Sequence, residues 1–336
     1  MKVDAPLIGQ ALAQVPAAAR DAEALGFDGV YTFEGPHEPF FPLLLAAEHT
    51  ERIELATAIA VAFARTPMTV ANIAWDLQIM SRGRFVLGLG TQIRPHIERR
   101  FSMPWSQPAE RMREFVLALR SIFDRWQHGT PLDFRGKFYT HSLMTPMFDP
   151  GPLEWGPPRI MLAGVGRRMT EVAGEVADGF IAHPFTTEKF LRETTLPALL
   201  TGRTRSERAG DIEVALPAMV AIGDTDTEQK SALDALRYRL AFYGSTPAYR
   251  VVLDAHGWSD VQPELNRLSK AGDWATMVTL IDDAMLDEFV TVGTLEQIPE
   301  RLRARYGDLV DRVSFEPPPG TDPDRVRAVI AAIQSA

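Results

Sequence analysis

Short apolar runs alternate with amphipathic stretches along most of the chain. Residues 53–61 are almost entirely apolar, which is typical of a strand buried on both faces of a sheet. Between 108 and 126, apolar side chains recur every three or four positions, which predicts a helix with one buried face. By the same criteria, further strands are predicted at 2–7, 28–33, 85–89, 159–163, 179–182, 212–222 and 312–315.

Helical patterns fill the intervals between these strands, for example at 11–25, 66–80, 167–176 and 187–200. Strands that alternate with helices indicate a parallel sheet of the α/β class. Eight such units closing on themselves form a (β/α)8 TIM barrel, which needs about 250 residues. The chain has 336 residues. Two irregular regions, about 129–158 and 244–289, account for most of the excess, and we predict that they are insertions into a single domain spanning 1–336.

Composition narrows the class of protein. The chain has no cysteine, which excludes disulfides, thiolate-bound zinc, iron–sulfur clusters and cysteine nucleophiles. Its formal charge of -9 argues against nucleic acid or an anionic membrane as the main partner. No signal peptide is visible at the N-terminus, and the most apolar run is too short to span a bilayer. We therefore expect a soluble, cytoplasmic protein that acts on a small molecule.

The strand ends carry the candidate chemistry, because TIM barrels place their active sites at the C-terminal ends of the strands. The segment 164–166 (GVG) ends one predicted strand and opens a helix that begins with Arg167 and Arg168. Free amides at a helix N-terminus beside two guanidinium groups suit a phosphate. The segment 88–90 (GLG) is similar, but neither segment completes the G-x-G-x-x-G motif. A tight strand-to-helix turn is the alternative for each.

Glu34 and His37 lie in the loop after the second predicted strand, within four residues of each other. A carboxylate and an imidazole at this place could act as a general acid and base, although an ordinary polar loop would contain the same residues. His96 and His183 also follow strand ends and are site candidates by position alone. We predict no metal site, because no HExxH motif or other cluster of metal ligands is present.

Four segments of the chain form a recognisable set: ALGFDGVYTFE (24–34), LATAIAVAFARTP (55–67), SRGRFVLGLGT (81–91) and PPRIMLAGVGRRMTEVAGEVADGF (157–180). Together they resemble the bacterial luciferase-like superfamily. Its members are flavin-dependent monooxygenases and oxidoreductases that use the deazaflavin coenzyme F-420, and the pattern is most similar to the F-420-dependent branch. The resemblance implies a barrel with its cofactor ring at the C-terminal mouth, and it makes a homodimer plausible.

The resemblance also implies roles for individual residues. Glu34 matches the acidic residue after the second strand. The pair Thr57-Ala58 matches the position at which the family has a cis peptide against the cofactor ring, and His96 falls near a cofactor contact. The residues whose amides would hold the cofactor phosphate, with an arginine beside them, are Gly164, Val165, Gly166 and Arg167.

Two departures from the family's sugar-phosphate dehydrogenase branch concern the substrate. Gly35 stands where that branch has a histidine base, and Thr91 stands where it has a glutamate. Both departures speak against a substrate of the glucose 6-phosphate type. His37, two residues beyond Gly35, could replace the missing base.

The resulting hypothesis is an F-420-dependent oxidoreductase. A hydride would pass between a small organic substrate and the C5 carbon of the deazaflavin, and Glu34 and His37 would handle protons or contact the ring. Two alternatives remain. One is an FMN-dependent monooxygenase that receives reduced flavin from a partner reductase, and the other is a non-catalytic flavin or deazaflavin carrier.

Overall fold

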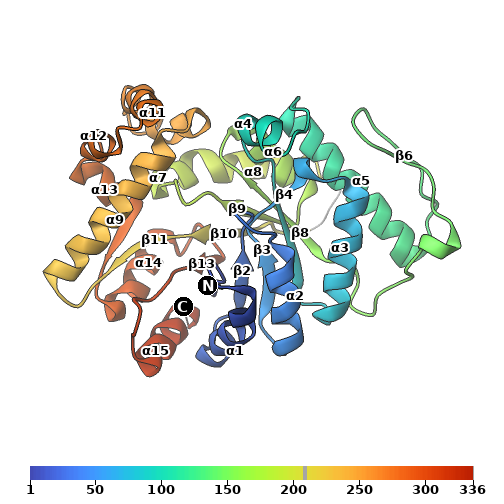
Figure 1. The fold of residues 1–336 in the computed structure, drawn as a ribbon, viewed down its shortest axis with the longest axis horizontal. Coiled ribbons are helices and arrows are strands. Elements are labelled where there is room, and N and C mark those ends of the chain that lie inside the picture. The colour runs from blue at the N-terminus through green and yellow to red at the C-terminus, as the bar shows by residue number, and fades with distance from the viewer. Residues whose placement is uncertain (207–209, 336) are drawn as a thin grey trace.

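Residues 1–206 and 210–335, which the computed structural model describes, form a closed parallel barrel of eight strands surrounded by helices (Figure 1). Each strand pairs in parallel with the next, and the last strand pairs back with the first. The predicted (β/α)8 fold is therefore confirmed. The strands are β1 (Lys2–Pro6), β2 (Gly29–Thr32), β3 (Glu54–Thr57), β5 (Phe85–Gly90), β8 (Arg159–Gly164), β9 (Gly179–Ala182), β10 (Glu213–Pro217) and β13 (Arg312–Ser314).

The helices around the barrel follow local sequence signals. Gly26 ends α1 with a φ of 93°, a left-handed conformation that glycine adopts readily. The Thr66 hydroxyl caps α3 by accepting from the Thr69 amide. None of the described helices is long and apolar enough to cross a membrane. The helices are α1 (Val15–Leu25), α2 (Phe40–His49), α3 (Pro67–Met80), α5 (Pro108–His128), α6 (Arg167–Val176), α8 (Leu196–Arg203), α14 (Ile298–Tyr306) and α15 (Pro323–Gln334).

The apolar stripe of α5 packs against α3 on the outside of the barrel. Trp126 and Phe123 lie with their ring centroids 5.2 and 5.4 Å from that of Trp75. All three side chains are buried. The aromatic residues of this stripe therefore belong to the core, and their burial is sufficient to explain the periodicity.

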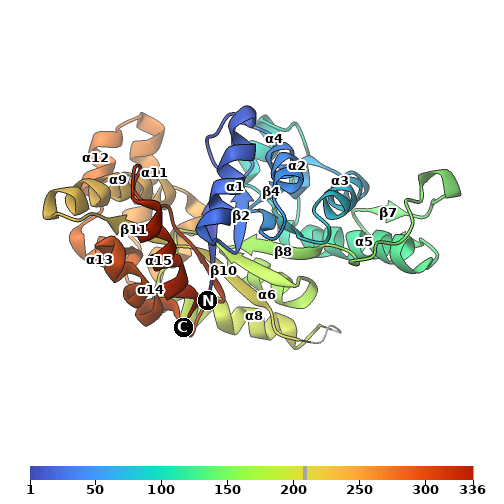
Figure 2. The ribbon, with the colours of Figure 1, turned by 90° about the horizontal axis from the view of Figure 1, so that it is seen from below.

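The region 129–158 leaves the barrel as an arm with a short antiparallel hairpin, β6 (Phe134–Arg135) and β7 (Thr140–His141). The arm stands at one end of the molecule in both views (Figures 1 and 2). The carboxylate of Glu114 in α5 accepts hydrogen bonds from three consecutive backbone amides of the hairpin, at 137–139. This anchor explains how a segment rich in proline and glycine keeps a defined position.

A second apolar cluster lies at the opposite end of the molecule, around α9 (Asp226–Gly244) and the helices that follow it (Figure 1). The strand predicted at 212–222 divides after Pro217: β11 (Met219–Ile222) leaves the barrel and pairs in parallel with β12 (Val290–Gly293). The prediction included neither β12 nor α13. The helices after α9 are α10 (Arg250–Asp254), α11 (Val261–Ala271), α12 (Trp274–Thr279) and α13 (Asp283–Phe289).

Two other predicted elements differ from the structure, and one short helix was not predicted. The strand predicted at 53–61 is split into β3 and β4 (Ala60–Val61) by a cis peptide. The helix predicted at 187–200 consists of α7 (Glu188–Phe190), a π-helical turn and α8. A short helix, α4 (Arg94–Arg99), occupies the loop that contains His96.

Charged side chains close the N-terminal end of the barrel. The buried guanidinium of Arg312 in β13 contacts the carboxylates of Asp4 at 2.6 Å, Glu54 at 2.5 Å and Glu213 at 3.1 Å. Arg159 in β8 adds ion pairs to Glu54 and Glu213. Burial raises the pKa of Asp4 to about 6, despite the attraction of Arg312. These ion pairs close the N-terminal end of the barrel, and we call this network around Arg312 and Arg159 the floor of the barrel.

Candidate active site

The interior near the C-terminal ends of the strands is apolar. Val86, Met161 and Ile181 form a buried cluster, and partly exposed alanines and Ile59 pack against it. Apolar walls built from small side chains are typical of sites that hold a flat ring. The partly exposed residues of this wall are Ala56, Ala58, Ile59, Ala163 and Ala215.

The end of β3 is locked to β5. The Thr57 hydroxyl donates to the Gly88 carbonyl oxygen at 2.7 Å and accepts from the Gly88 amide at 2.9 Å. A Cβ on residue 88 would lie 1.8 Å from the carbonyl oxygen of Thr57, so glycine is required there. The cis peptide joins Ala58 to Ile59, one residue beyond the expected Thr57-Ala58 bond. The Thr57 hydroxyl is buried and makes its hydrogen bonds within the protein, whereas Ala58 belongs to the wall of the mouth.

Glu34 is buried just after β2 and is held by an ion pair that the sequence interpretation missed. Its Oε2 atom accepts from the Val61 amide at 2.7 Å and from Arg65 Nη1 at 2.6 Å. Nη2 of the same guanidinium donates to Glu38 at 2.6 Å. Burial lowers the pKa of Arg65, but the two carboxylates outweigh burial and raise it. Glu34 therefore ties the loop after β2 to the segment after β3.

His37 and His96 are both exposed at the rim of the mouth. His37 lies in the loop between β2 and α2, and His96 lies on α4. Arg100, just after α4, donates a hydrogen bond to the carbonyl oxygen of Gly35. The structure therefore brings the loops that carry these two histidines together, although each imidazole faces solvent.

The N-terminus of α6 follows β8 directly. Gly166 is its N-cap residue, and no side chain caps the helix, so the first backbone amides have no intrahelical partner. A Cβ on Gly166 would meet nothing within 4 Å, which leaves open space over these amides. Arg167 pairs with Glu171 at 3.0 Å and Arg168 pairs with Glu110. Both arginine side chains are about three-quarters exposed, at 74% and 77%.

Thr186 is a candidate that the sequence interpretation did not single out. It lies after β9 and lines a small cavity, of about 10 Å³, together with Gly164 and Val165. Its hydroxyl is buried and has no hydrogen-bond partner among the described residues. A cavity of this size holds about one water molecule, so a larger anion would sit over it, against the α6 amides. A buried hydroxyl without a partner beside uncapped amides fits the phosphate of a cofactor.

His183 lines the same cavity. Its Nδ1 atom accepts from the Phe185 amide at 3.0 Å, which places the proton of the neutral ring on Nε2. The ring centroid lies 4.3 Å from that of Tyr249 and 4.9 Å from that of Tyr243. Burial lowers the pKa of His183 to about 4. The imidazole is therefore uncharged near neutral pH and presents an N–H donor.

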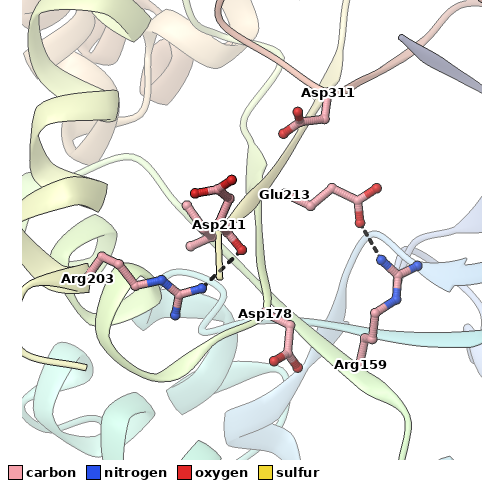
Figure 3. Close-up of a pocket in the computed structure, with 7 residues that line it drawn as sticks. Arg159, Asp178, Arg203, Asp211, Glu213 and Asp311 are labelled. Carbon is pink, nitrogen blue, oxygen red and sulfur yellow. Dashed lines mark hydrogen bonds and ion pairs between the residues drawn. The ribbon is translucent and has the colours of Figure 1, made fainter. Parts of the chain in front are cut away.

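A larger cavity, of about 450 Å³, lies at the opposite end of the barrel (Figure 3). It is lined by residues at the starts of β8, β9, β10 and β13, including Arg159, Glu213 and Asp311. Arg159 donates to Glu213 at 2.6 Å, and Asp311 accepts from the Val214 amide at 2.8 Å. These charged groups hold the floor together, and TIM barrels carry their chemistry at the other end. The smaller mouth cavity is therefore the better candidate.

The closed barrel, with its arm and its second apolar cluster, places the chain among the TIM-barrel proteins. Residues 2–312 match the sequence profile of the luciferase-like monooxygenase family. The chain belongs to this luciferase-like family.

Relatives of known sequence cover nearly the whole chain. An uncharacterized protein of Mycobacterium tuberculosis (strain H37Rv) is 56% identical over 93% of this chain and 92% of its own length. The 5,10-methylenetetrahydromethanopterin reductase of Archaeoglobus fulgidus is 28% identical over 90% of this chain and 88% of its own length. The second relative supports an oxidoreductase.

Solved structures share the fold. The coenzyme F-420-dependent tetrahydromethanopterin reductase of Methanopyrus kandleri has a TM-score of 0.79 and 20% identity, covering 99% of this chain and 98% of its own. The oxygenating component of 3,6-diketocamphane monooxygenase from Pseudomonas putida, in complex with FMN, has a TM-score of 0.67 and 16% identity, covering 99% and 96%. Proteins with either cofactor therefore have this architecture.

Proposed function

We propose that this protein is a coenzyme F-420-dependent oxidoreductase that transfers a hydride between a small organic substrate and the deazaflavin. The reductase relative in Archaeoglobus fulgidus supports the reaction class, and the F-420-dependent structural neighbour supports the cofactor. The observation that carries the proposal is the unpartnered Thr186 hydroxyl beside the uncapped N-terminus of α6.

Each group of residues in the site would have its own role in this reaction. When bound, the deazaflavin would accept or deliver the hydride at its C5 carbon. The amides of Gly164–Gly166 and the Thr186 hydroxyl would hold its phosphate. The apolar wall around Ala58 would exclude water from the ring. The pair of Glu34 and Arg65 would keep the loops after β2 and β3 in place, and His37 at the rim would exchange a proton with the substrate.

Cofactor binding by the purified apo-protein is the first test. Oxidised F-420 and FMN are titrated separately, and their fluorescence is followed. We expect F-420 to bind with a Kd in the micromolar range or tighter, and FMN far more weakly. A preference for FMN would instead support a monooxygenase supplied by a partner reductase, in line with the family description and the FMN-bound neighbour. Binding of neither cofactor would refute the proposal.

The Thr186→Val variant tests the carrying observation. A hydrogen bond to a charged group contributes about 1.5–3 kcal/mol, so the Kd for F-420 should rise by tenfold or more. Thr291→Val is a matched control, because Thr291 is equally buried at 5% exposure and its hydroxyl also lacks a partner in the described chain. Thr291 does not line the cavity, so this variant should bind F-420 as the wild type does.

Neither variant should lose stability in urea, because a buried hydroxyl without a partner is unfavourable in the folded state. Equal F-420 affinity for Thr186→Val and the wild type would remove Thr186 from the phosphate site.

A further inference from the structure

The cavity beside the N-terminus of α6 carries no formal charge on its described lining. The lining consists of glycine, alanine, valine, phenylalanine and threonine residues and of one histidine, His183. Its polar groups toward a ligand are therefore neutral donors: backbone amides, the Thr186 hydroxyl and the imidazole Nε2–H. This composition is unusual for an anion site, because surface phosphate sites commonly use arginine or lysine.

The two arginines at the start of α6 do not change this balance. Arg168 is paired with Glu110. Arg167 is paired with Glu171, which Arg205 also contacts at 3.2 Å, but the side chains of Arg167 and Arg205 are 74% and 55% exposed, so solvent screens the one excess charge of this cluster. The remaining positive charge is that of the helix N-terminus, which amounts to roughly half an elementary charge. This partial positive charge compensates a ligand with one negative charge more fully than a ligand with two.

The groups packed around His183 leave it neutral as well. Tyr249 and Tyr243 contact its ring, and burial raises the pKa of both phenols above their ordinary value. Arg239 of α9 is the cation whose charge reaches Tyr243, and it lowers the pKa of that phenol slightly against burial. Arg239 itself is exposed to solvent, so its charge is screened.

We propose that this pocket selects a phosphodiester, which carries a single negative charge, over a phosphomonoester, which carries up to two. The inference rests on the proposed function and deepens it. F-420 contains a phosphodiester, whereas the phosphate of FMN is a monoester. The neutral donors and the helix N-terminus compensate one charge, and a second charge on a phosphate seated over the cavity would lie against these groups without a counter-ion of its own. The pocket is thus a specificity element between the two cofactors.

The test compares each cofactor with its phosphate-free form. The affinity ratio of FMN to riboflavin isolates the phosphate contribution, and the ratio of F-420 to its phosphate-free deazaflavin riboside measures the phosphodiester together with the tail that it joins. Both ratios cancel any titration of the ring. Both ratios are measured with the wild-type protein at pH 5.5 and pH 7.5. A phosphomonoester has a second pKa of about 6, so a pocket that accepts only the monoanion should lower the FMN ratio by about 25-fold over this range. The F-420 ratio should not change.

The outcomes separate the two proposals. An FMN ratio that stays level or rises between pH 5.5 and pH 7.5 would overturn the selectivity and leave the proposed function standing. An FMN ratio that falls between pH 5.5 and pH 7.5 as expected, while the F-420 ratio stays at tenfold or more, supports it. An F-420 ratio of one would refute the phosphate site itself, and with it the proposed function.

A pair of variants on α6 tests the role of charge. Glu171→Gln releases both Arg167 and Arg205 from their shared carboxylate and removes one negative charge near the pocket. It should raise the FMN ratio at pH 7.5 by about two- to fivefold, the range expected for one charge near a helix terminus. Glu175→Gln is the matched control, because Glu175 is one turn further along α6, equally shielded (15% against 16% exposed), and paired with Arg113. An equal effect of both substitutions would contradict the proposal.

Discussion

Replacing Arg65 with methionine would leave a carboxylate inside the protein without its counter-ion. The Glu34 side chain is 6% exposed, and after the substitution its Oε2 atom would keep one partner, the Val61 amide at 2.7 Å. Removing one member of a buried ion pair costs about 3–5 kcal/mol, because the remaining charge is neither solvated nor paired. We expect Arg65→Met to lower the free energy of unfolding by this amount.

Urea unfolding measures this change. With an m-value of about 3 kcal/mol per molar urea, the midpoint should fall by about 1–1.7 M. Arg94→Met is the control, because Arg94 forms an exposed pair with Glu98 one helical turn away. Exposed pairs contribute little, so this midpoint should change by less than about 0.2 M.

The double variant Arg65→Met/Glu34→Gln separates the buried charge from the loss of the arginine itself. The side-chain amide introduced by Glu34→Gln could still accept from the Val61 amide through its carbonyl oxygen and would carry no charge, so part of the lost stability should return. The reasoning is refuted if Arg65→Met costs less than about 1 kcal/mol, or if the double variant is no more stable than the single one.

Three further predictions concern other parts of the barrel. Gly88→Ala should cost about 3 kcal/mol or more, because its Cβ would meet the Thr57 carbonyl oxygen; Gly166→Ala, which meets nothing, should be neutral in the same urea assay. Folding raises the pKa of Asp4 from 3.8 to about 6, so its contribution to stability is present below pH 4 and is lost as the pH rises through 6, by up to about 3 kcal/mol. Urea midpoints should therefore show Asp4→Asn gaining on the wild type between pH 4 and pH 7, and a constant difference would contradict this. His37→Ala should lower kcat about a hundredfold with the true substrate and leave the urea midpoint unchanged; unchanged turnover would exclude His37 from proton transfer.

The parts of the fold that sequence patterns predicted well are those governed by local interactions. The helix over Arg167–Val176 and the strand over Gly179–Ala182 have the predicted bounds, because glycine and alanine residues or polar turns mark both ends. The pairing of strands, in contrast, depends on residues that are far apart in the chain. Met219–Ile222 continues the apolar run of β10, and its departure from the barrel depends on a partner strand about 70 positions later in the chain. No local sequence pattern predicts that pairing.

The residues of the candidate site also divide into those that local sequence patterns predicted and those that they did not. Position after a predicted strand was enough to place Glu34, His96 and the 164–166 segment around the mouth. The partner of Glu34 was not predictable, because Arg65 lies 31 positions further along the chain, although it belongs to the segment that carries the family resemblance. Thr186 carries no sequence signal of its own. Its significance appears only when burial and the missing hydrogen-bond partner are known together.

The two ends of the barrel handle charge in opposite ways, and this contrast bears on the proposed chemistry. At the floor, Arg312 meets three carboxylates in a network that joins β1, β3, β10 and β13. At the mouth, the wall is apolar, and the arginines of α6 are exposed and paired with glutamates. A weakly polar site strengthens the interaction of a bound anion with a few oriented N–H groups, and a lining without charged side chains penalises a second negative charge. The features that would keep water from a hydride-transferring ring are therefore the same features that would distinguish a phosphodiester from a phosphomonoester.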